Sequence, residues 1–223
     1  MSINTPELVL LDLDGTLVDS IPDLAFSVNK TLLDLSIQER TLDDIRSWVG
    51  NGVEKLLHRA LTNDIDGEAE TDLFDMAFEK FMAIYANNTC TLSNCYPGVI
   101  EGLNQLKLQN IMLGCVTNKS GQFVGPILEK LGIMDHMSIV IAGDTLPKKK
   151  PDPLPLLHAA SVFDKSPELS LMVGDSESDV NAARAAGFQI VCVSYGYNHG
   201  RDIRETRPDA VIDSLTELST LFH

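Results

Sequence analysis

The sequence lacks any long hydrophobic run. No stretch of its 223 residues approaches the roughly 20 consecutive apolar residues that a membrane-spanning helix needs. Basic residues are absent from Met1 to Glu7, and the apolar run that follows is too short for a signal peptide. We therefore expect no membrane contact and a cytoplasmic location.

Positive charge is also scarce, because 17 basic residues face 32 acidic ones and leave a formal net charge of −15. Such a surface repels phosphate backbones, which argues against nucleic acid as a partner. It repels small anions as well. An anionic substrate would therefore need a local positive centre, which a bound metal ion and one lysine could supply.

Cysteine is rare, and its pattern does not favour a zinc site. Cys115 and Cys192 lie in apolar, strand-like runs, where a free cysteine usually packs as a small hydrophobic residue. Cys90 and Cys95 are close enough to raise zinc or a disulfide, but no CxxC motif and no histidine at a ligand spacing accompanies them. We interpret the four residues as packing residues.

Hydrophobic patterning predicts alternating strands and helices over most of the chain. Helical stretches separate some of the short apolar runs that read as strands. The strands are expected at 7–13, 111–116, 139–142, 169–173, 189–193 and 210–212, and the helices at about 99–106, 123–131, 153–162 and 177–186. This alternation predicts an α/β fold with a doubly wound, mainly parallel, Rossmann-like sheet.

Residues 21–88 have a different pattern, with apolar positions at helical spacing and no convincing strand. We expect an all-helical insertion after the first strand. The predicted organisation is therefore an α/β core made of residues 1–18 and 92–223, with a helical cap at 19–91.

Two carboxylates, Asp12 and Asp14, stand where the first strand gives way to a loop. A carboxylate can attack a phosphoryl group and form an acyl phosphate. A second acid can protonate the leaving alkoxide and then deprotonate water. A DxD pair alone is more often a plain acidic turn, so this motif needs support from others.

Further polar signals follow other predicted strands. Thr117 and Asn118 can hold phosphate oxygens, although the pair is also common in turns. Residues 148–150 are three lysines before a proline, which are either a solvated surface or a source of one phosphate-binding charge. Asp175 and Asp179 suit Mg²⁺, or else cap a helix. In parallel sheets, all these strand ends meet at one edge.

The joint arrangement resembles the haloacid dehalogenase-like superfamily, through DLDGT at 12–16, a threonine at the second strand, a Lys-Pro loop and GDSxxD at 174–179. The resemblance covers essentially the whole chain. It implies that Asp12 is the nucleophile, Asp14 the general acid and base, and Lys150 the group that stabilises charge. It also implies that Thr117 binds the transferring phosphoryl group, helped by the Asn118 backbone.

The same resemblance implies a Mg²⁺ ion held by Asp12, the Asp14 carbonyl and Asp175, with Asp179 as a ligand or as a neighbour of the ligands. The dehalogenase branch lacks the second acid of the DxD pair. The presence of Asp14 therefore favours phosphoryl transfer over dehalogenation.

A closer resemblance is to the bacterial phosphoglycolate phosphatase family, through DLDGTLVDS, RSWVGNG at 46–52 and YGYN at 195–198. It implies hydrolysis of 2-phosphoglycolate. Gly50, Asn51 and Gly52 would bring a cap loop to the substrate, and Arg46 could meet a carboxylate or lie exposed on its helix. His58 and Arg59 are expected on the helix surface.

Other functions remain open from the sequence. The expected partner is a small anionic phosphate ester, and the protein is expected to be a monomer or homodimer. The alternatives are a sugar-phosphate phosphatase or phosphomutase of the same superfamily, and a non-catalytic phosphate-binding protein on the same fold. The last would be expected to lack one of Asp12, Asp14, Lys150 or Asp175, and all four are present.

Overall fold

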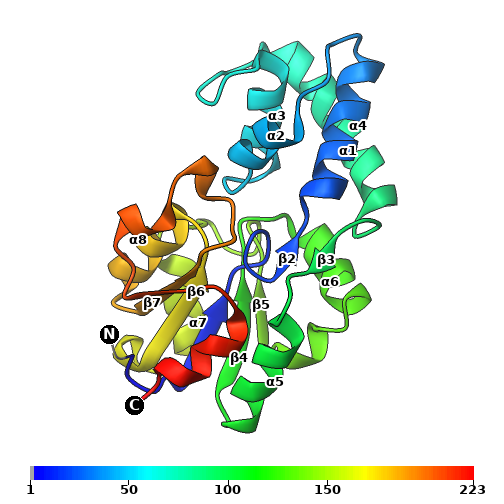
Figure 1. The fold of residues 1–223 in the computed structure, drawn as a ribbon. Coiled ribbons are helices and arrows are strands. Elements are labelled where there is room, and N and C mark those ends of the chain that lie inside the picture. The colour runs from blue at the N-terminus through cyan, green and yellow to red at the C-terminus, as the bar shows by residue number, and fades with distance from the viewer. Residues whose placement is uncertain (1–2) are drawn as a thin grey trace.

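A parallel sheet forms the centre of the computed structural model, which describes residues 3–223 (Figure 1). Within this range the sheet has six strands in the order β5-β4-β1-β6-β7-β8, and every pairing is parallel. The strands are β1 (Leu8–Leu11), β4 (Met112–Val116), β5 (Ile139–Ile141), β6 (Ser170–Gly174), β7 (Gln189–Val193) and β8 (Ala210–Ile212). The predicted doubly wound α/β fold is confirmed.

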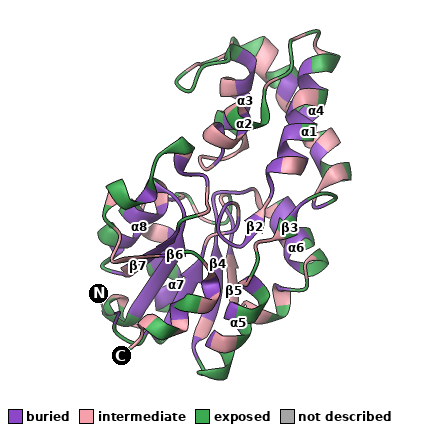
Figure 2. Ribbon diagram, in the orientation of Figure 1, coloured by how far each residue is buried: buried purple, intermediate pink, exposed green. Residues whose placement is uncertain are grey.

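Helices cover both faces of the sheet, which is why its strands are apolar almost throughout. The side chains of β1 alternate between the faces: Leu8 and Leu10 belong to one buried cluster, and Val9 and Leu11 to the other. Figure 2 shows the neighbouring strand β6 coloured as buried. The first face is covered by α7 (Leu154–Val162) and α8 (Glu177–Ala186), and the second by α5 (Val99–Leu108), α6 (Gly121–Lys130) and η5 (Leu215–Leu221).

The inserted segment consists of helices, and no strand lies between residues 21 and 88, as predicted. Its elements are α1 (Ile21–Asp34), α2 (Leu42–Trp48), α3 (Val53–Thr62) and α4 (Thr71–Asn88). Figure 1 shows these helices grouped beyond the end of the sheet. We refer to residues 19–91 as the cap; the exact division between core and cap stays a prediction.

Short elements complete the described chain. They are β2 (Val18–Asp19), β3 (Asn94–Cys95), η1 (Met134–His136), η2 (Pro167–Leu169), η3 (Asn198–Gly200) and η4 (Ile203–Thr206). The four cysteines are free thiols, three of them buried, which agrees with a packing role. Among residues 3–223, no helix is long and apolar enough to cross a lipid bilayer.

The two connections between sheet and cap lie side by side. β2 and β3 pair antiparallel, with Val18 opposite Cys95. The carboxylate of Asp23, at the start of α1, is only 1% exposed and accepts hydrogen bonds from the backbone N–H groups of Leu92 and Ser93 at 2.9 and 2.8 Å. The Ser93 hydroxyl donates to the same carboxylate. One buried side chain therefore joins the chain entering the cap to the chain leaving it.

Replacing Asp23 by alanine should destabilise the protein, because the buried N–H group and hydroxyl of Ser93 and the partly buried N–H group of Leu92 would lose their acceptor. We expect the free energy of unfolding to fall by about 2–4 kcal/mol, since each unsatisfied buried group costs about 1–3 kcal/mol. Urea denaturation measures this. Asp34→Ala is the matched control, because Asp34 makes a partly exposed ion pair with Lys30 and should cost less than about 1 kcal/mol. Equal losses in the two variants would contradict the assignment.

Candidate active site

Three carboxylates meet at the carboxyl edge of the sheet. Asp12 directly follows β1, Asp175 follows β6, and Asp179 lies in the first turn of α8. Because β1 and β6 are parallel neighbours, their ends deliver Asp12 and Asp175 to the same place. One carboxylate oxygen from each of the three residues lies within 4.8 Å of the others. The sequence prediction that these acids share one edge agrees with this geometry.

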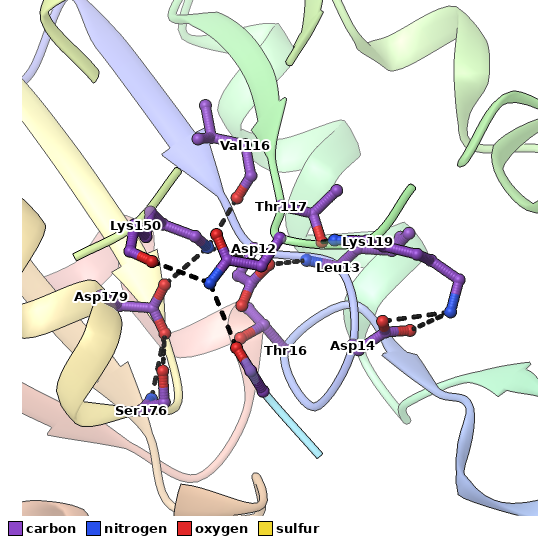
Figure 3. A network of polar contacts seen from close by, with 12 residues as sticks. Asp12, Leu13, Asp14, Thr16, Val116, Thr117, Lys119, Lys150, Ser176 and Asp179 are labelled. Atoms are coloured by element: carbon purple, nitrogen blue, oxygen red, sulfur yellow. Dashed lines mark hydrogen bonds and ion pairs between the residues drawn. The ribbon is translucent and has the colours of Figure 1, made fainter. Parts of the chain in front are cut away.

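Lys150 is the cation at the centre of this acidic group (Figure 3). Its ammonium lies 3.0 Å from Asp12 Oδ1 and 2.7 Å from Asp179 Oδ1, and donates to the Val116 carbonyl at 2.7 Å. Lys150 is 2% exposed, whereas the side chains of Lys148 and Lys149 are exposed on the surface. Of the three adjacent lysines, the one before Pro151 therefore reaches the site.

The second carboxylate oxygen of Asp179 accepts hydrogen bonds from the surrounding loop. Its Oδ2 accepts from the Ser176 hydroxyl at 2.7 Å and from the N–H groups of Ser176 and Asp175 at 3.0 and 3.2 Å. This arrangement is a capping box at the start of α8. Both oxygens of Asp179 are thus engaged, one by Lys150 and one by the loop, so this carboxylate is suited to holding Lys150 and Asp175 in position.

Asp175 is oriented by two donors and a glycine. Its Oδ1 accepts from the Thr16 hydroxyl at 2.9 Å, and its Oδ2 accepts from the Tyr197 N–H at 2.8 Å. Gly15 has φ +87°, and a Cβ at this position would lie 2.5 Å from Asp175 Oδ2. The turn between Asp14 and Thr16 therefore needs glycine, both for its backbone angle and for the close approach of Asp175.

The buried carboxylates carry more negative charge than the ammonium of Lys150 can balance. Desolvation raises the pKa of Asp12 to about 7, although Lys150 opposes the shift. Desolvation, followed by the nearby charges of Asp179 and Asp12, raises the pKa of Asp175 to about 8. A divalent cation would relieve this repulsion, and oxygen-only donors of this kind suit a hard cation. The residues present therefore fit a metal site.

Asp14 lies beside a second buried ammonium, that of Lys119, which the sequence analysis missed. Lys119 Nζ is 3.1 and 3.2 Å from the two Asp14 oxygens, and the Ser20 hydroxyl donates to Asp14 Oδ1 at 2.6 Å. Burial alone would lower the pKa of Lys119, but the Asp14 carboxylate and the Tyr85 hydroxyl together outweigh burial and hold the pKa above its usual value. In sequence, Lys119 resembles any turn lysine; its position two residues after Thr117 was the available signal.

A narrow cavity of about 50 Å³ opens next to Asp12 and Asp14. Core residues and cap residues both line it. From the core come Asp12, Asp14, Thr117, Asn118, Lys119, Ser120 and Phe123, and from the cap Leu24, Val49, Gly50, Gly52, Val53, Leu56, Phe81 and Tyr85. The structure thus brings the predicted residues Thr117, Asn118, Gly50 and Gly52 together with the DxD pair.

The amide of Asn118 links the cap loop to the core, and the guanidinium of Arg59 fixes the same loop to α3 within the cap. Asn118 Nδ2 donates to the Gly50 carbonyl at 3.2 Å and to the Lys150 carbonyl at 2.9 Å. Arg59 Nη1 donates to the Trp48 carbonyl at 2.7 Å and to Asn51 Oδ1 at 2.9 Å. The prediction of a surface position is therefore wrong for Arg59, because it is partly buried and its fork binds the cap loop.

Arg46 lies apart from the cavity. Its guanidinium carbon sits 5.6 Å from the centroid of the Tyr197 ring, and it is not among the described residues that line the cavity. Nearby, His199 Nδ1 lies 2.7 Å from the Ser47 carbonyl. The predicted meeting of Arg46 with a carboxylate stays a prediction, and the contact with Tyr197 places this arginine between cap and core.

Comparison with known proteins agrees with this geometry. Residues 9–193 match the family model described as haloacid dehalogenase-like hydrolase. The chain belongs to this family. It is 57% identical to a phosphoglycolate phosphatase from Nitrosococcus oceani, over 98% of this chain and 97% of that protein. It is 47% identical to a phosphoglycolate phosphatase from Nitrosospira multiformis, over 96% and 94% of the two chains.

A solved structure supports the same relationship. The crystal structure of a predicted phosphoglycolate phosphatase from Haemophilus somnus superposes on this haloacid dehalogenase-like hydrolase with a TM-score of 0.92. That protein is 37% identical, and the match covers 96% of this chain and 97% of the other. The predicted superfamily and the predicted relationship to phosphoglycolate phosphatases are confirmed.

Lys150→Met should destabilise the metal-free protein in a pH-dependent way. At about pH 8 in EDTA, the loss of one partner from a buried ion pair should cost about 3–5 kcal/mol. At about pH 5.5 the cost should be smaller, because Asp12 and Asp175, whose pKa values are raised, are then largely protonated. Urea denaturation at both pH values measures the difference.

Lys165→Met is the matched control, because Lys165 pairs with Glu7 at 2.7 Å on the surface. Its cost should stay below about 1 kcal/mol at either pH. A Lys150→Met cost that does not change with pH would contradict the charge-balancing role of Lys150.

Proposed function

We propose that this protein hydrolyses 2-phosphoglycolate to glycolate and phosphate through a phosphorylated Asp12. Its family and its relatives named phosphoglycolate phosphatase indicate the predicted enzyme class, a phosphoric monoester hydrolase. The observation that carries the proposal is the pair Asp12 and Asp14 in one small cavity, each beside its own buried ammonium.

In the first step, an oxygen of Asp12 attacks phosphorus, and the bond from phosphorus to the ester oxygen breaks. Asp14 gives its proton to the leaving oxygen, so glycolate departs with its hydroxyl restored. Asp12 is left as an acyl phosphate. Lys150, 3.0 Å from Asp12, stabilises the attacking carboxylate, and Thr117, which lines the cavity, binds a phosphoryl oxygen through its hydroxyl.

In the second step, Asp14 takes a proton from water, and the water oxygen attacks phosphorus. The bond from phosphorus to Asp12 breaks, which releases phosphate and restores the Asp12 carboxylate. Asp14 holds the proton needed for the next cycle. The hydrogen bond from Ser20 and the ion pair with Lys119 fix the carboxylate of Asp14 for both proton transfers.

We assign the metal to Mg²⁺, held by Asp12, Asp175 and the main-chain carbonyl of Asp14. When bound, it would supply positive charge to the phosphoryl oxygens. Asp179 is a neighbour of these metal ligands, and it holds Lys150 and the loop of Asp175 in position. The cap loop around Gly50 and Gly52 closes the cavity from the other side and excludes bulk water, and opening of the cap releases the product.

The cavity favours a two-carbon acid over a sugar. Because a cavity needs roughly 10–15 Å³ for each water molecule, a volume of about 50 Å³ holds about three to five water-sized groups. A carboxymethyl group needs less of this space than a hexose does, and the hydroxyls of a hexose would meet the apolar side chains of Leu24, Leu56 and Phe81.

The decisive experiment measures phosphate release from 2-phosphoglycolate, 3-phosphoglycerate, glucose phosphates and a nucleotide, with Mg²⁺ and with EDTA. We expect a Mg²⁺-dependent preference for 2-phosphoglycolate. Equal turnover of sugar phosphates would contradict the substrate assignment while leaving the chemistry in place.

Asp12→Asn provides the test of the nucleophile within the same assay. An amide oxygen is a poor nucleophile, so kcat should fall by a factor on the order of 10⁴ or more. Retention of wild-type turnover would remove the acyl-phosphate mechanism. Asp34→Asn, an exposed carboxylate on α1, should leave kcat unchanged.

Mg²⁺ should stabilise the protein more as pH rises. Asp12 and Asp175 have pKa values raised above those of the unfolded chain, so the metal-free protein loses stability as pH rises through about 7 and 8. Ionised carboxylates are also the form that binds the cation. Thermal unfolding in EDTA and in Mg²⁺ measures both effects, and metal at 100 times its Kd adds about 2.7 kcal/mol. Stabilisation by Mg²⁺ that does not grow between about pH 5.5 and pH 8 would be incompatible with this site.

A further inference from the structure

The proposed mechanism uses the ammonium of Lys119 only to hold Asp14, yet this ammonium also lies where it can contact a ligand in the cavity. The Lys119 side chain is 5% exposed and lines the same cavity as Asp12. In Figure 3, Lys150 and Lys119 approach the Asp12–Asp14 segment from opposite sides. The site therefore contains two buried cations, although a phosphoryl group bound at Asp12 needs only Lys150.

Lys119 has a hydrogen-bond donor beyond those that Asp14 accepts. An ammonium carries three N–H donors. The two oxygens of Asp14 lie within reach of Lys119 Nζ, at 3.1 and 3.2 Å, and account for at most two of these donors. The third donor faces the Tyr85 hydroxyl, which helps to raise the pKa of Lys119, so the two groups lie together at the cavity wall.

The Tyr85 hydroxyl has no acceptor for its own proton. Tyr85 is 1% exposed, and among residues 3–223 the polar group that its hydroxyl faces is the Lys119 ammonium, which can only donate. Its ring is fixed between Phe81, at a centroid distance of 5.4 Å, and Phe123, at 4.7 Å in edge contact. Lys119 Nζ lies 4.9 Å from the centroid of the same ring. A buried phenol without an acceptor is costly, so a ligand that accepts its hydrogen bond is favoured.

We propose that Lys119 and the Tyr85 hydroxyl together bind the carboxylate of the substrate, and so select phosphate esters of small hydroxy acids. This inference rests on the proposed function and adds the residues that recognise the organic end of the substrate. A carboxylate accepts hydrogen bonds and carries no donor, so it complements an ammonium and a phenol. The core supplies Lys119 and the cap supplies Tyr85, so the recognition site is complete only when both parts meet.

Arg46 is the rival for this role, because it is the cap arginine that the sequence suggests for a carboxylate. Its guanidinium lies against Tyr197, away from the described lining of the cavity. Binding by Arg46 would need a rearrangement of the cap loop. Lys119 needs none.

The test measures binding in the non-hydrolysing Asp12→Asn background, with Mg²⁺ present, by calorimetric titration. Two probes are compared: 2-phosphoglycolate and ethyl phosphate, which has a methyl group in place of the carboxylate. Lys119→Met should weaken binding of 2-phosphoglycolate on the order of 10- to 100-fold, because a charge-assisted contact is lost. Binding of ethyl phosphate should change by less than about 3-fold, since it makes no such contact.

Tyr85→Phe keeps the ring and removes only the hydroxyl, so it tests the site without a change of charge. We expect a loss of roughly 3- to 10-fold for 2-phosphoglycolate and none for ethyl phosphate. Lys165→Met, which removes a lysine paired with Glu7 on the surface, should alter neither affinity. Arg46→Met should not change the preference between the two probes.

The outcomes separate this inference from the proposed function. Equal losses for both probes in Lys119→Met would mean that Lys119 acts only through Asp14, and would overturn the inference. A selective loss in Arg46→Met without one in Lys119→Met would also overturn it. In either case the parent protein would still prefer 2-phosphoglycolate. If the parent shows no such preference, the proposed substrate and the carboxylate site both fail.

Discussion

The site depends on one buried ammonium, that of Lys150, between the carboxylates of Asp12 and Asp179. Burying three acids within a few ångströms is costly, and a single lysine offsets only part of that cost. The remaining deficit is visible in the raised pKa values of Asp12 and Asp175. The same excess of negative charge favours binding of a divalent cation at the carboxyl edge of the sheet. Stability and metal affinity therefore have a common electrostatic origin in this molecule.

The cavity is built by two parts of the chain with different contributions. The core supplies all the groups that our mechanism assigns to the phosphoryl end, because these follow the ends of neighbouring parallel strands. The cap supplies apolar walls and aromatic rings, which set the size of what can enter. Asn118 connects the two through the carbonyls of Gly50 and Lys150. Closure of the cap and placement of the lysine loop are thus linked through one amide side chain, to which Lys149 adds an ion pair with Glu54 of α3 at 3.9 Å.

The fold could be predicted in detail because the strands of the sheet are short apolar runs, which are buried on both faces in the central strands β1, β4, β6 and β7 and partly buried in the edge strands β5 and β8. The strand-end rule then brought Asp12, Thr117 and Asp175 together without knowledge of any contact. Local patterns could not distinguish Lys119 from a solvated lysine, because its burial comes from Tyr85 and Asp14, which lie far away in sequence. Arg59 was misplaced for a different reason, since its partners are near in sequence but include the backbone carbonyls of Trp48 and Ile65, which leave no side-chain pattern. The two-residue strands β2 and β3 are too short to leave a periodic signal.

The antiparallel pairing of β2 with β3 has an evolutionary consequence. The chain leaves the core at β2 and returns to it at β3, and these two strands are paired. A helical segment of another length could therefore be exchanged there without disturbing the strand order of the sheet. Phosphate chemistry can then be inherited while substrate preference diversifies. Tyr85 would be lost in such an exchange and Lys119 would remain. Descendants of this scaffold would therefore inherit a bias toward acidic substrates before any new lid had been selected.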